Sequence, residues 1–273
     1  FETKTLAQIL HFAGDGKLRD GNNTSRELRE LLELVPSKLL KQFSDTCLGE
    51  SFNESGYALQ DIINQIGVRL GFSVEFGLYR GKTNDIGYDG IWQTSDKHSL
   101  VVEVKTTDAY SINLDTIAAY RNRLIQANRI DPLKSSILIV VGRQDTGGLE
   151  AQVRGSKHAW DIRMISIDSL TNLLSLKETL NDTRTIQQIN ELLKPREYTR
   201  IDDLIELIFL TSKDLQQDVL QESAVEVVVP LNGEKALRPT LLKTPKFTPV
   251  NFHEECLSRI QRTLKMNFIK SHV

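Results

Sequence analysis

The apolar run from Ile137 to Val141 is the feature that most constrains the fold of this chain. A strand with apolar side chains on both faces has to be covered on both faces, which is typical of an interior strand in a sheet that carries helices on either side. The segments 114–126 and 149–159 around it have apolar residues at helical spacing. We therefore expect an α/β domain built on a mixed sheet.

The pattern of apolar residues predicts the same architecture across residues 56–167. A helix is expected to follow Gly56 and to end at Gly71, because glycine commonly terminates helices. Short or alternating apolar runs predict strands over residues 72–76, 86–92, 100–105 and 162–167, and a closing helix over 170–180. The predicted order is α, β, β, β, α, β, α, β, in which the strands 86–92 and 100–105 form a hairpin.

The regions on either side of this core are predicted to be mainly helical. Thr24 or Ser25 is expected to cap a helix near the N-terminus, and Pro195 lies in a charged stretch that marks a boundary. The predicted domains are an N-terminal helical segment (1–50), a core domain (51–194) and a mostly helical C-terminal region of unknown fold (195–273). Because the chain opens on Phe1 rather than on methionine and stops just after a helical pattern, we expect it to be a truncated piece of a longer protein.

Charge and cysteine content limit the functions that the chain can have. Lys and Arg number 34 against 36 Asp and Glu, a formal charge of -2, so any nucleic-acid contact must come from a local basic region. Residues 121–163 form such a region. The phosphate contacts predicted there are Arg121, Arg154 and Lys157. Cys47 and Cys256 have no partner at metal-ligand spacing, which argues against a zinc site or a disulfide framework and favours a reducing cytoplasm.

Two neighbouring segments combine charged residues with strand-forming ones. Asp89 lies in the first, and Glu103 and Lys105 lie in the second, separated by Val104. Because side chains alternate along a strand, Glu103 and Lys105 project from the same face, while the valines beside them project into a core. In a hairpin with strands roughly 4.8 Å apart, Asp89 can lie beside Glu103. Such a cluster suits hydrolysis of a phosphodiester, since hard oxygen ligands bind Mg²⁺ and an ammonium group can orient the attacking water.

These residues resemble the signature of a known nuclease superfamily. Asp89 followed by Glu103-Val104-Lys105 is similar to the PD-(D/E)XK motif, with Tyr88 in the place of the proline. The helix beginning Gly56-Tyr57-Ala58-Leu59-Gln60 resembles that of the Mrr-type restriction endonucleases, in which a glutamate usually stands at the position of Gln60. An amide oxygen can still bind a metal ion or its water, so Gln60 remains a candidate. The resemblance spans roughly residues 56–167 and implies a restriction-endonuclease-like αβββαβ core.

The resemblance implies a Mg²⁺-dependent DNA endonuclease, with Mn²⁺ able to replace Mg²⁺, that acts in restriction or antiviral defence. Such enzymes often pair two sites to cut two strands, so a homodimer is expected, and the C-terminal region is expected to govern target choice or contact with a partner. The implied catalytic residues are Asp89, Glu103, Lys105 and Gln60, and the implied metal ligands are Asp89, Glu103 and Val104, the last through its carbonyl. Tyr120 ends a segment similar to the Q-L-x-x-Y motif of RecB-like members and joins the predicted nucleic-acid contacts. No apolar stretch is long enough to cross a membrane, so no membrane association is expected.

Two other functions fit the same residues. A nuclease fold that has lost its activity and only binds nucleic acid is permitted by Gln60 in place of glutamate. The other is an effector nuclease that a partner activates and whose substrates include RNA; activity that depends on an added partner would distinguish it. The purely structural alternatives are a solvated strand face for Glu103 and Lys105 and a simple turn at Asp89-Gly90.

Overall fold

The structure is a computed structural model, and it describes residues 4–49, 52–80, 85–106, 112–142, 147–180 and 182–195, together with positions 201, 202, 205 and 208. The chain divides into two compact units, Phe1–Asp203 and Leu204–Val273. Apart from Ile205 and Ile208, the second unit lies outside the described residues, and so do the helical patterns expected in the C-terminal region. In the described part of the chain, no helix is both long and apolar enough to span a membrane.

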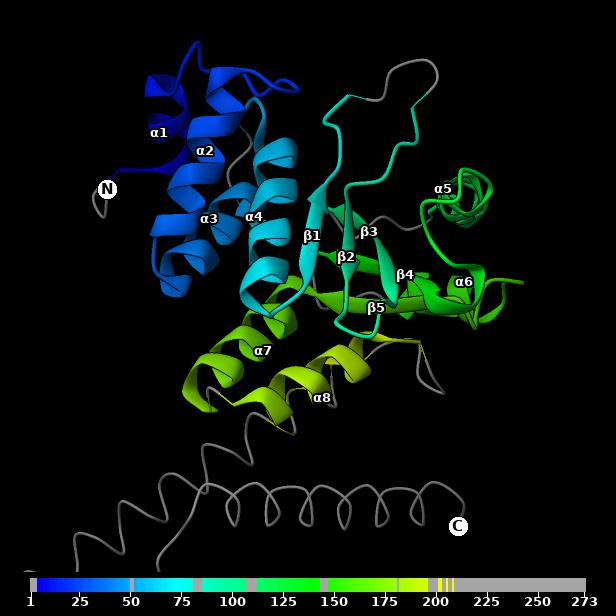
Figure 1. Ribbon diagram of the computed structural model, residues 1–273. Coiled ribbons are helices and arrows are strands. Elements are labelled where there is room, and N and C mark those ends of the chain that lie inside the picture. The colour runs from blue at the N-terminus through cyan, green and yellow to red at the C-terminus, as the bar shows by residue number, and fades with distance from the viewer. Residues whose placement is uncertain are drawn as a thin grey trace, which may run out of the picture. The chain divides into compact units, whose positions relative to one another are not determined.

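A five-stranded mixed sheet forms the centre of the first unit (Figure 1). Its strands are β1 (Ser73–Phe76), β2 (Gly90–Gln93), β3 (Ser99–Lys105), β4 (Ser135–Val141) and β5 (Ile162–Ser166). They lie in sequence order; β1 to β3 pair antiparallel, whereas β3 to β5 pair parallel. Parallel neighbours need a crossover connection, which α5 (Leu114–Gln126) and α6 (Gly147–Arg154) supply. The expected α/β class with a mixed sheet is confirmed.

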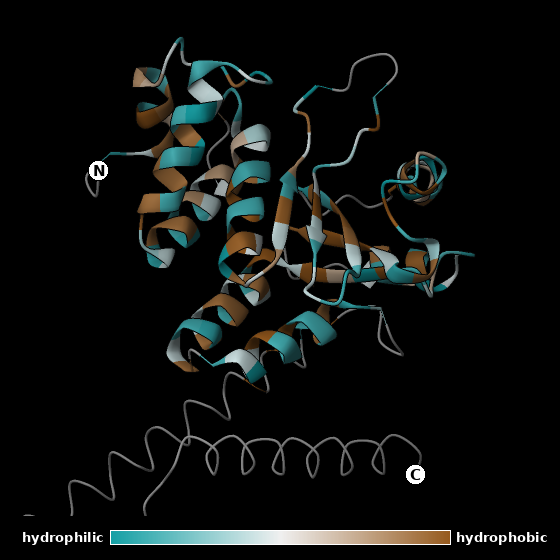
Figure 2. Cartoon of the chain, in the orientation of Figure 1, coloured by the Kyte–Doolittle hydropathy of each residue, from teal (hydrophilic) through white to brown (hydrophobic). Residues whose placement is uncertain are grey.

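Helices cover both faces of this sheet. The other helices are α1 (Leu6–Phe12), α2 (Asn23–Leu34), α3 (Ser37–Gly49), α4 (Ser55–Arg69), α7 (Ile167–Leu180) and α8 (Thr183–Leu193). One face of the sheet packs on α4 and α7. The opposite face packs on α5 and α6 in a buried cluster that includes Ile91, Val101 and Ile139. The strands of the parallel part of the sheet are coloured mostly as hydrophobic, whereas the helices carry hydrophobic and hydrophilic residues in alternating bands (Figure 2).

The predicted order of helices and strands in the core is confirmed. β4 is buried along its whole length, as its apolar sequence indicated. β2 and β3 form the expected hairpin, with Gly90 opposite Val102. Several predicted boundaries were wrong: the strand expected from Ile86 begins only at Gly90, the helix expected over 149–159 ends at Arg154, and the helix expected over 170–180 begins at Ile167. β2 starts late because the N–H of Val104 is bonded to the Asp89 carboxyl group, so that no main-chain carbonyl continues the ladder there.

α2 and α3 pack against α4. The cap of α2 is Asn22, which lies two residues before Thr24 and three before Ser25; it accepts a hydrogen bond from the N–H of Ser25 at 3.0 Å. Thr24 instead donates its hydroxyl to a carbonyl of the preceding loop. At the C-terminal end of α4, Arg69 donates to the carbonyl of Leu32 at 2.8 Å. The predicted boundaries of the three domains remain predictions.

Candidate functional site

Asp89 lies where β2 and β3 begin to separate. Its N–H donates to the carbonyl of Val102 at 3.1 Å, which continues the pairing of the two strands. The next ladder position is different, because the N–H of Val104 donates to the Asp89 carboxyl oxygen Oδ2 at 2.7 Å. The side chain of Asp89 has thus taken the place of a main-chain carbonyl, and its carboxyl group is fixed against the edge of β3.

The main-chain carbonyl of Asp89 is held from the opposite direction. It accepts hydrogen bonds from the N–H of Gly77 at 2.9 Å and from the side-chain amides of Gln60 at 3.1 Å and Asn64 at 2.9 Å. Asn64 in turn accepts the indole N–H of Trp92 at 2.9 Å, and it is buried. Asn64 and Trp92 could not be recognised as site residues from the sequence, because their connection to Asp89 exists only once α4 packs on the sheet.

Two glycines permit this close packing. A Cβ atom on Gly90 would lie 2.1 Å from Oδ1 of Asn64, and one on Gly77 would lie 2.1 Å from the carbonyl oxygen of Tyr88. Both distances are far inside van der Waals contact with groups that cannot move aside. Gly90 was weighed as a turn signal, but the structure places it inside β2, where it makes room for Asn64.

Glu103 and Lys105 leave β3 on the face that α5 covers, the face on which Val101 is buried. The Lys105 ammonium donates to Oε1 of Glu103 at 2.5 Å. Glu103 is only 8% exposed, so the alternative of a fully solvated strand face is wrong for this residue. A buried carboxylate needs a charged or hydrogen-bonding partner, and Lys105 supplies one.

The electrostatics of the cluster favour the binding of positive charge. Burial raises the pKa of Asp89 to about 7; the charge of Glu103 adds to this rise, whereas the Val104 N–H and Lys105 oppose it. Burial also raises the pKa of Glu103, against the effect of Lys105. For Lys105, burial alone would lower the pKa, but Glu103 and Asp89 outweigh it and the pKa is raised. Two carboxylates thus share one ammonium, and a proton or a metal cation can supply the missing charge.

The raised pKa of Asp89 predicts a pH-dependent stability in the presence of EDTA. Between its ordinary pKa of 3.8 and about 7, the folded protein holds a proton that the unfolded chain releases. The contribution of Asp89 to the free energy of unfolding is therefore fully present below about pH 4 and is lost as the pH rises through 7. Urea unfolding should show that Asp89→Asn gains stability relative to wild type as the pH rises through this window. Parallel pH profiles would contradict the buried position of the carboxyl group.

The oxygen atoms around Asp89 and Glu103 form a donor set that fits a magnesium ion. Because the N–H and C=O of one strand residue point to the same edge, the Val104 carbonyl faces the side on which Asp89 lies, beyond the last paired residue of β2. Among the described residues, no group of three or more His, Cys, Asp or Glu could hold a metal ion. An ion here would therefore use two carboxylates, uncharged oxygens and water. Mg²⁺ commonly binds proteins in this way, through one or two carboxylates with several waters retained.

Gln60 is brought to the site, but in a different orientation from the one expected. Its Nε2 donates to the carbonyl of Asp89 rather than approaching either carboxyl group. The side-chain oxygen is the atom left to meet a metal ion or its water, and the direct contact that Gln60 makes is with the main chain. The structure thus gives Gln60 a positioning contact that the sequence did not predict.

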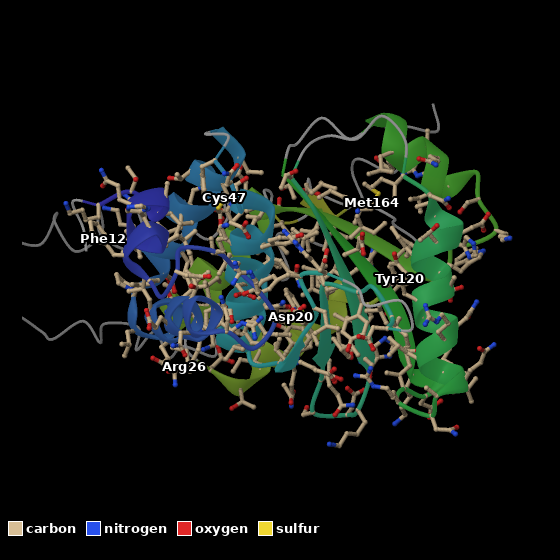
Figure 3. The ribbon with its side chains drawn as sticks, turned by 90° about the horizontal axis from the view of Figure 1, so that it is seen from above. Phe12, Asp20, Arg26, Cys47, Tyr120 and Met164 are labelled. Atoms are coloured by element: carbon tan, nitrogen blue, oxygen red, sulfur yellow. The ribbon has the colours of Figure 1, made fainter. Side chains whose placement is uncertain are left out.

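The predicted nucleic-acid contacts divide into two groups. Tyr120 of α5 (Figure 3) lies beside the segment that precedes Asp89, since its hydroxyl would lie 3.2 Å from a Cβ on Gly87. Arg121 is committed to the start of β4, where it donates to Ser135 Oγ at 3.0 Å and to the carbonyl of Pro132 at 2.9 Å. The remaining two pair with nearby acids, Arg154 with Glu150 at 2.6 Å and Lys157 with Asp115 at 3.0 Å. Only Tyr120 of the four is thereby shown beside the cluster.

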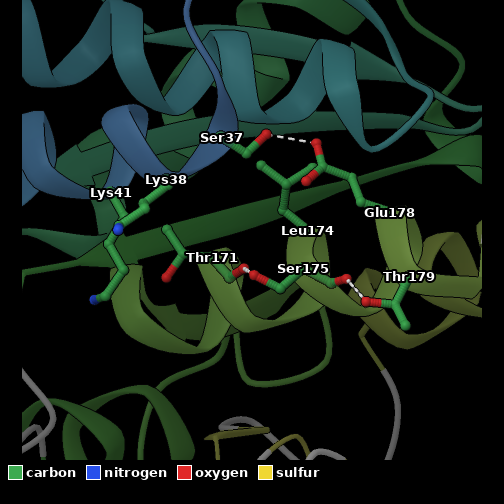
Figure 4. A pocket seen from close by; sticks show the side chains of 8 residues that line it. All are labelled: Ser37, Lys38, Lys41, Thr171, Leu174, Ser175, Glu178 and Thr179. Atoms are coloured by element: carbon green, nitrogen blue, oxygen red, sulfur yellow. Dashed lines mark hydrogen bonds between the residues drawn. The ribbon is translucent and has the colours of Figure 1, made fainter. Parts of the chain in front are cut away.

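Two of the surface pockets among the described residues lie away from the Asp89 cluster, and neither is lined by Asp89 or Glu103. One, of about 420 Å³, lies between α3 and α7, where the hydroxyl of Ser37 donates to Glu178 at 2.5 Å (Figure 4). Lys41 at its rim is already paired with Asp168 at 2.6 Å. The second, of about 510 Å³, lies beside the start of α5. Neither pocket brings two acidic side chains and a cation together as the Asp89 cluster does.

Comparison with known proteins found no relative of this chain. No family model matches the chain, and neither a curated protein nor a solved structure matches it.

Proposed function

We propose that the protein is a metal-dependent endonuclease that hydrolyses phosphodiester bonds in DNA. The observation that carries this proposal is the placement of Asp89, Glu103 and Lys105 together at the end of the β2–β3 hairpin, with more acid than base in a partly buried site. The order αβββαβ and the mixed sheet support a restriction-endonuclease-like core, which we infer for the same region.

Each residue of the cluster has a distinct part in the proposed reaction. The carboxyl groups of Asp89 and Glu103 and the carbonyl of Val104 would hold Mg²⁺, or Mn²⁺ in its place. The bound ion would stabilise charge on the phosphate and lower the pKa of a water. Lys105 would orient the attacking water and balance charge on the phosphate oxygens. Gln60 and Asn64 would keep Asp89 in place through its main chain.

The biological setting belongs to the same proposal. We infer a role in restriction or antiviral defence, with a homodimer cutting both strands, because enzymes with the resembling motif commonly work in this way. A cytoplasmic location is supported by Cys47, which is a buried free thiol in the described part of the chain.

A cleavage assay tests the proposal. The purified full chain should convert supercoiled plasmid to nicked or linear DNA in Mg²⁺ or Mn²⁺ and leave it intact in EDTA. Single-stranded DNA and RNA should be included as substrates, because cleavage of RNA only after a partner is added would support the effector nuclease instead. Absence of cleavage on all substrates in both metals would contradict the proposal.

An inactive nucleic-acid-binding module is the second candidate. It is favoured by the amide of Gln60, which leaves two carboxylates where three are common, and by the pairing of Lys105 with Glu103. Retained DNA binding together with no cleavage in either metal would favour this candidate.

A further inference from the structure

We propose that Arg80 binds a backbone phosphate of the nucleic acid next to the cleaved one, and that Asp61 and Tyr79 position it there. This inference rests on the proposed function, because it assigns a substrate contact beside the same site. Arg80 is not one of the basic residues that the sequence pattern selected.

A buried ionic cluster lies one residue along α4 from Gln60. Arg29 of α2 donates to both carboxyl oxygens of Asp61, at 3.0 and 3.1 Å, and the hydroxyl of Tyr79 donates to the same carboxylate. The side chain of Asp61 is 0% exposed. Buried ion pairs often contribute little net stability compared with apolar side chains of similar volume. The cluster is therefore better explained by the geometry that it fixes.

The cluster fixes the path of the main chain in the residues that follow β1. The N–H of Tyr79 donates at 2.9 Å to Oδ1 of Asp20, which lies before α2 (Figure 3). The hydroxyl of Tyr79 donates to Asp61, so both the main chain and the ring of Tyr79 are fixed. The Arg29 guanidinium also stacks on the ring of Phe76 at 4.5 Å and of Tyr79 at 5.4 Å. Residue 79 is thus fixed by contacts with α4, with α2 and with the loop before α2.

Arg80 follows directly and projects into solvent. Tyr57 and, less strongly, Glu54 raise the pKa of the Arg80 guanidinium, and the ring of Tyr57 packs on that of Tyr79 at 5.2 Å. Because Tyr79 is fixed, the main chain of Arg80 is fixed where it follows Tyr79. The planar guanidinium group has several N–H donors and is well suited to bind a phosphate group.

The distance from Arg80 to the site suits a neighbouring phosphate. Arg80 follows Gly77 by three residues, and the N–H of Gly77 donates to the carbonyl of Asp89. Three residues of extended chain span at most about 11 Å, and successive nucleotides of one strand are about 3.4 Å apart along the duplex axis. A phosphate one to three nucleotides from the cleaved one therefore lies within the reach of Arg80. Its charge also offsets the repulsion between phosphate and the acids of the site.

The salt dependence of DNA binding tests this contact. Binding of a labelled duplex to the full chain would be measured by fluorescence anisotropy in the Lys105→Ala background, so that turnover does not interfere. Loss of one phosphate contact reduces the slope of log Kd against log salt by about 1, which corresponds to about tenfold weaker binding at 0.1 M salt. Arg80→Ala should show both effects, and Arg80→Lys should largely restore the slope. The matched control is Arg26→Ala, an exposed arginine of α2 that lies 3.9 Å from Glu30 and should change neither quantity.

A double-mutant cycle tests the positioning. Tyr79→Phe removes the hydroxyl that donates to Asp61 and keeps the ring, so it should fold and weaken DNA binding less than Arg80→Ala does. In the Arg80→Ala background the same substitution should have no further effect, because its influence acts through Arg80. A purely structural effect of Tyr79 would be additive in both backgrounds and would overturn the positioning.

The outcomes separate this inference from the proposed function. An unchanged salt slope in Arg80→Ala, while wild type cleaves DNA, would overturn the contact and leave the nuclease standing. If wild type neither bound nor cleaved nucleic acid, both would fail.

Discussion

Replacement of Lys105 by alanine is expected to lower the rate of plasmid cleavage in Mg²⁺ by about 10²- to 10⁴-fold, the usual contribution of a positioned proton-transfer or charge-stabilising group. The ammonium lies 2.5 Å from Glu103, and its removal leaves a buried carboxylate without its cation. Loss of Lys105 therefore removes both the group that orients the water and the charge that balances the site. Asp89→Asn should have an effect of similar size, because it removes a charged metal ligand while it can still accept the Val104 N–H.

Two measurements make this result specific. Lys38→Ala removes an exposed lysine of α3, outside the basic region 121–163, so it should cleave at the wild-type rate. Far-ultraviolet circular dichroism of Lys105→Ala should match that of wild type, which would exclude unfolding as the cause. Retention of more than about a tenth of the wild-type rate by Lys105→Ala would contradict its assigned part in the reaction.

Trp92→Ala is expected to lower the free energy of unfolding by about 3–5 kcal/mol, the usual cost of removing a large buried aromatic side chain. Trp92 is 0% exposed, and its ring packs on Phe72 at 5.4 Å. Gly67 lies so close that a Cβ there would come within 2.5 Å of the indole. The neighbouring side chains cannot fill the cavity readily, because α4 and β2 are both fixed around the ring. Urea unfolding followed by circular dichroism measures the effect.

Two further variants separate packing from hydrogen bonding at this position. Trp92→Phe keeps much of the ring but leaves Oδ1 of Asn64 without its donor, which should cost about 1–3 kcal/mol. Because Asn64 also donates to the Asp89 carbonyl, this variant should reduce cleavage as well. Trp160→Phe, at a side chain that is 80% exposed, should change the free energy of unfolding by no more than about 0.5 kcal/mol. A loss below about 1 kcal/mol for Trp92→Ala would show that the core does not depend on this ring.

The sequence was sufficient to predict the main architecture, because apolar periodicity reports directly on which faces are buried. The run Ile137–Val141 was placed correctly inside β4, and the alternation around Glu103 was placed correctly on β3. The pairing of Asp89 with β3 followed from the hairpin, and the structure adds that the carboxyl group itself replaces a ladder carbonyl. These features depend on local patterns or on neighbouring strands.

The features that could not be predicted depend on contacts between distant parts of the chain. The connection from Trp92 through Asn64 to Asp89 forms only when α4 packs on the sheet. Gln60 could be recognised as a site residue, but the direction of its amide is set by the Asp89 carbonyl that it meets. Arg121 was predicted to contact phosphate because the region around it is basic. In the folded chain its guanidinium instead donates hydrogen bonds at the start of β4.

The position of a bound metal ion is the most direct measurement of the central claim. Crystals of the protein soaked in Mn²⁺ would be measured for anomalous scattering, and the same would be done for Asp89→Asn. The account predicts an anomalous peak between the carboxyl groups of Asp89 and Glu103, next to the Val104 carbonyl, that is lost in the variant. A wild-type structure with no peak at this position, or with Mn²⁺ bound only elsewhere, would contradict it.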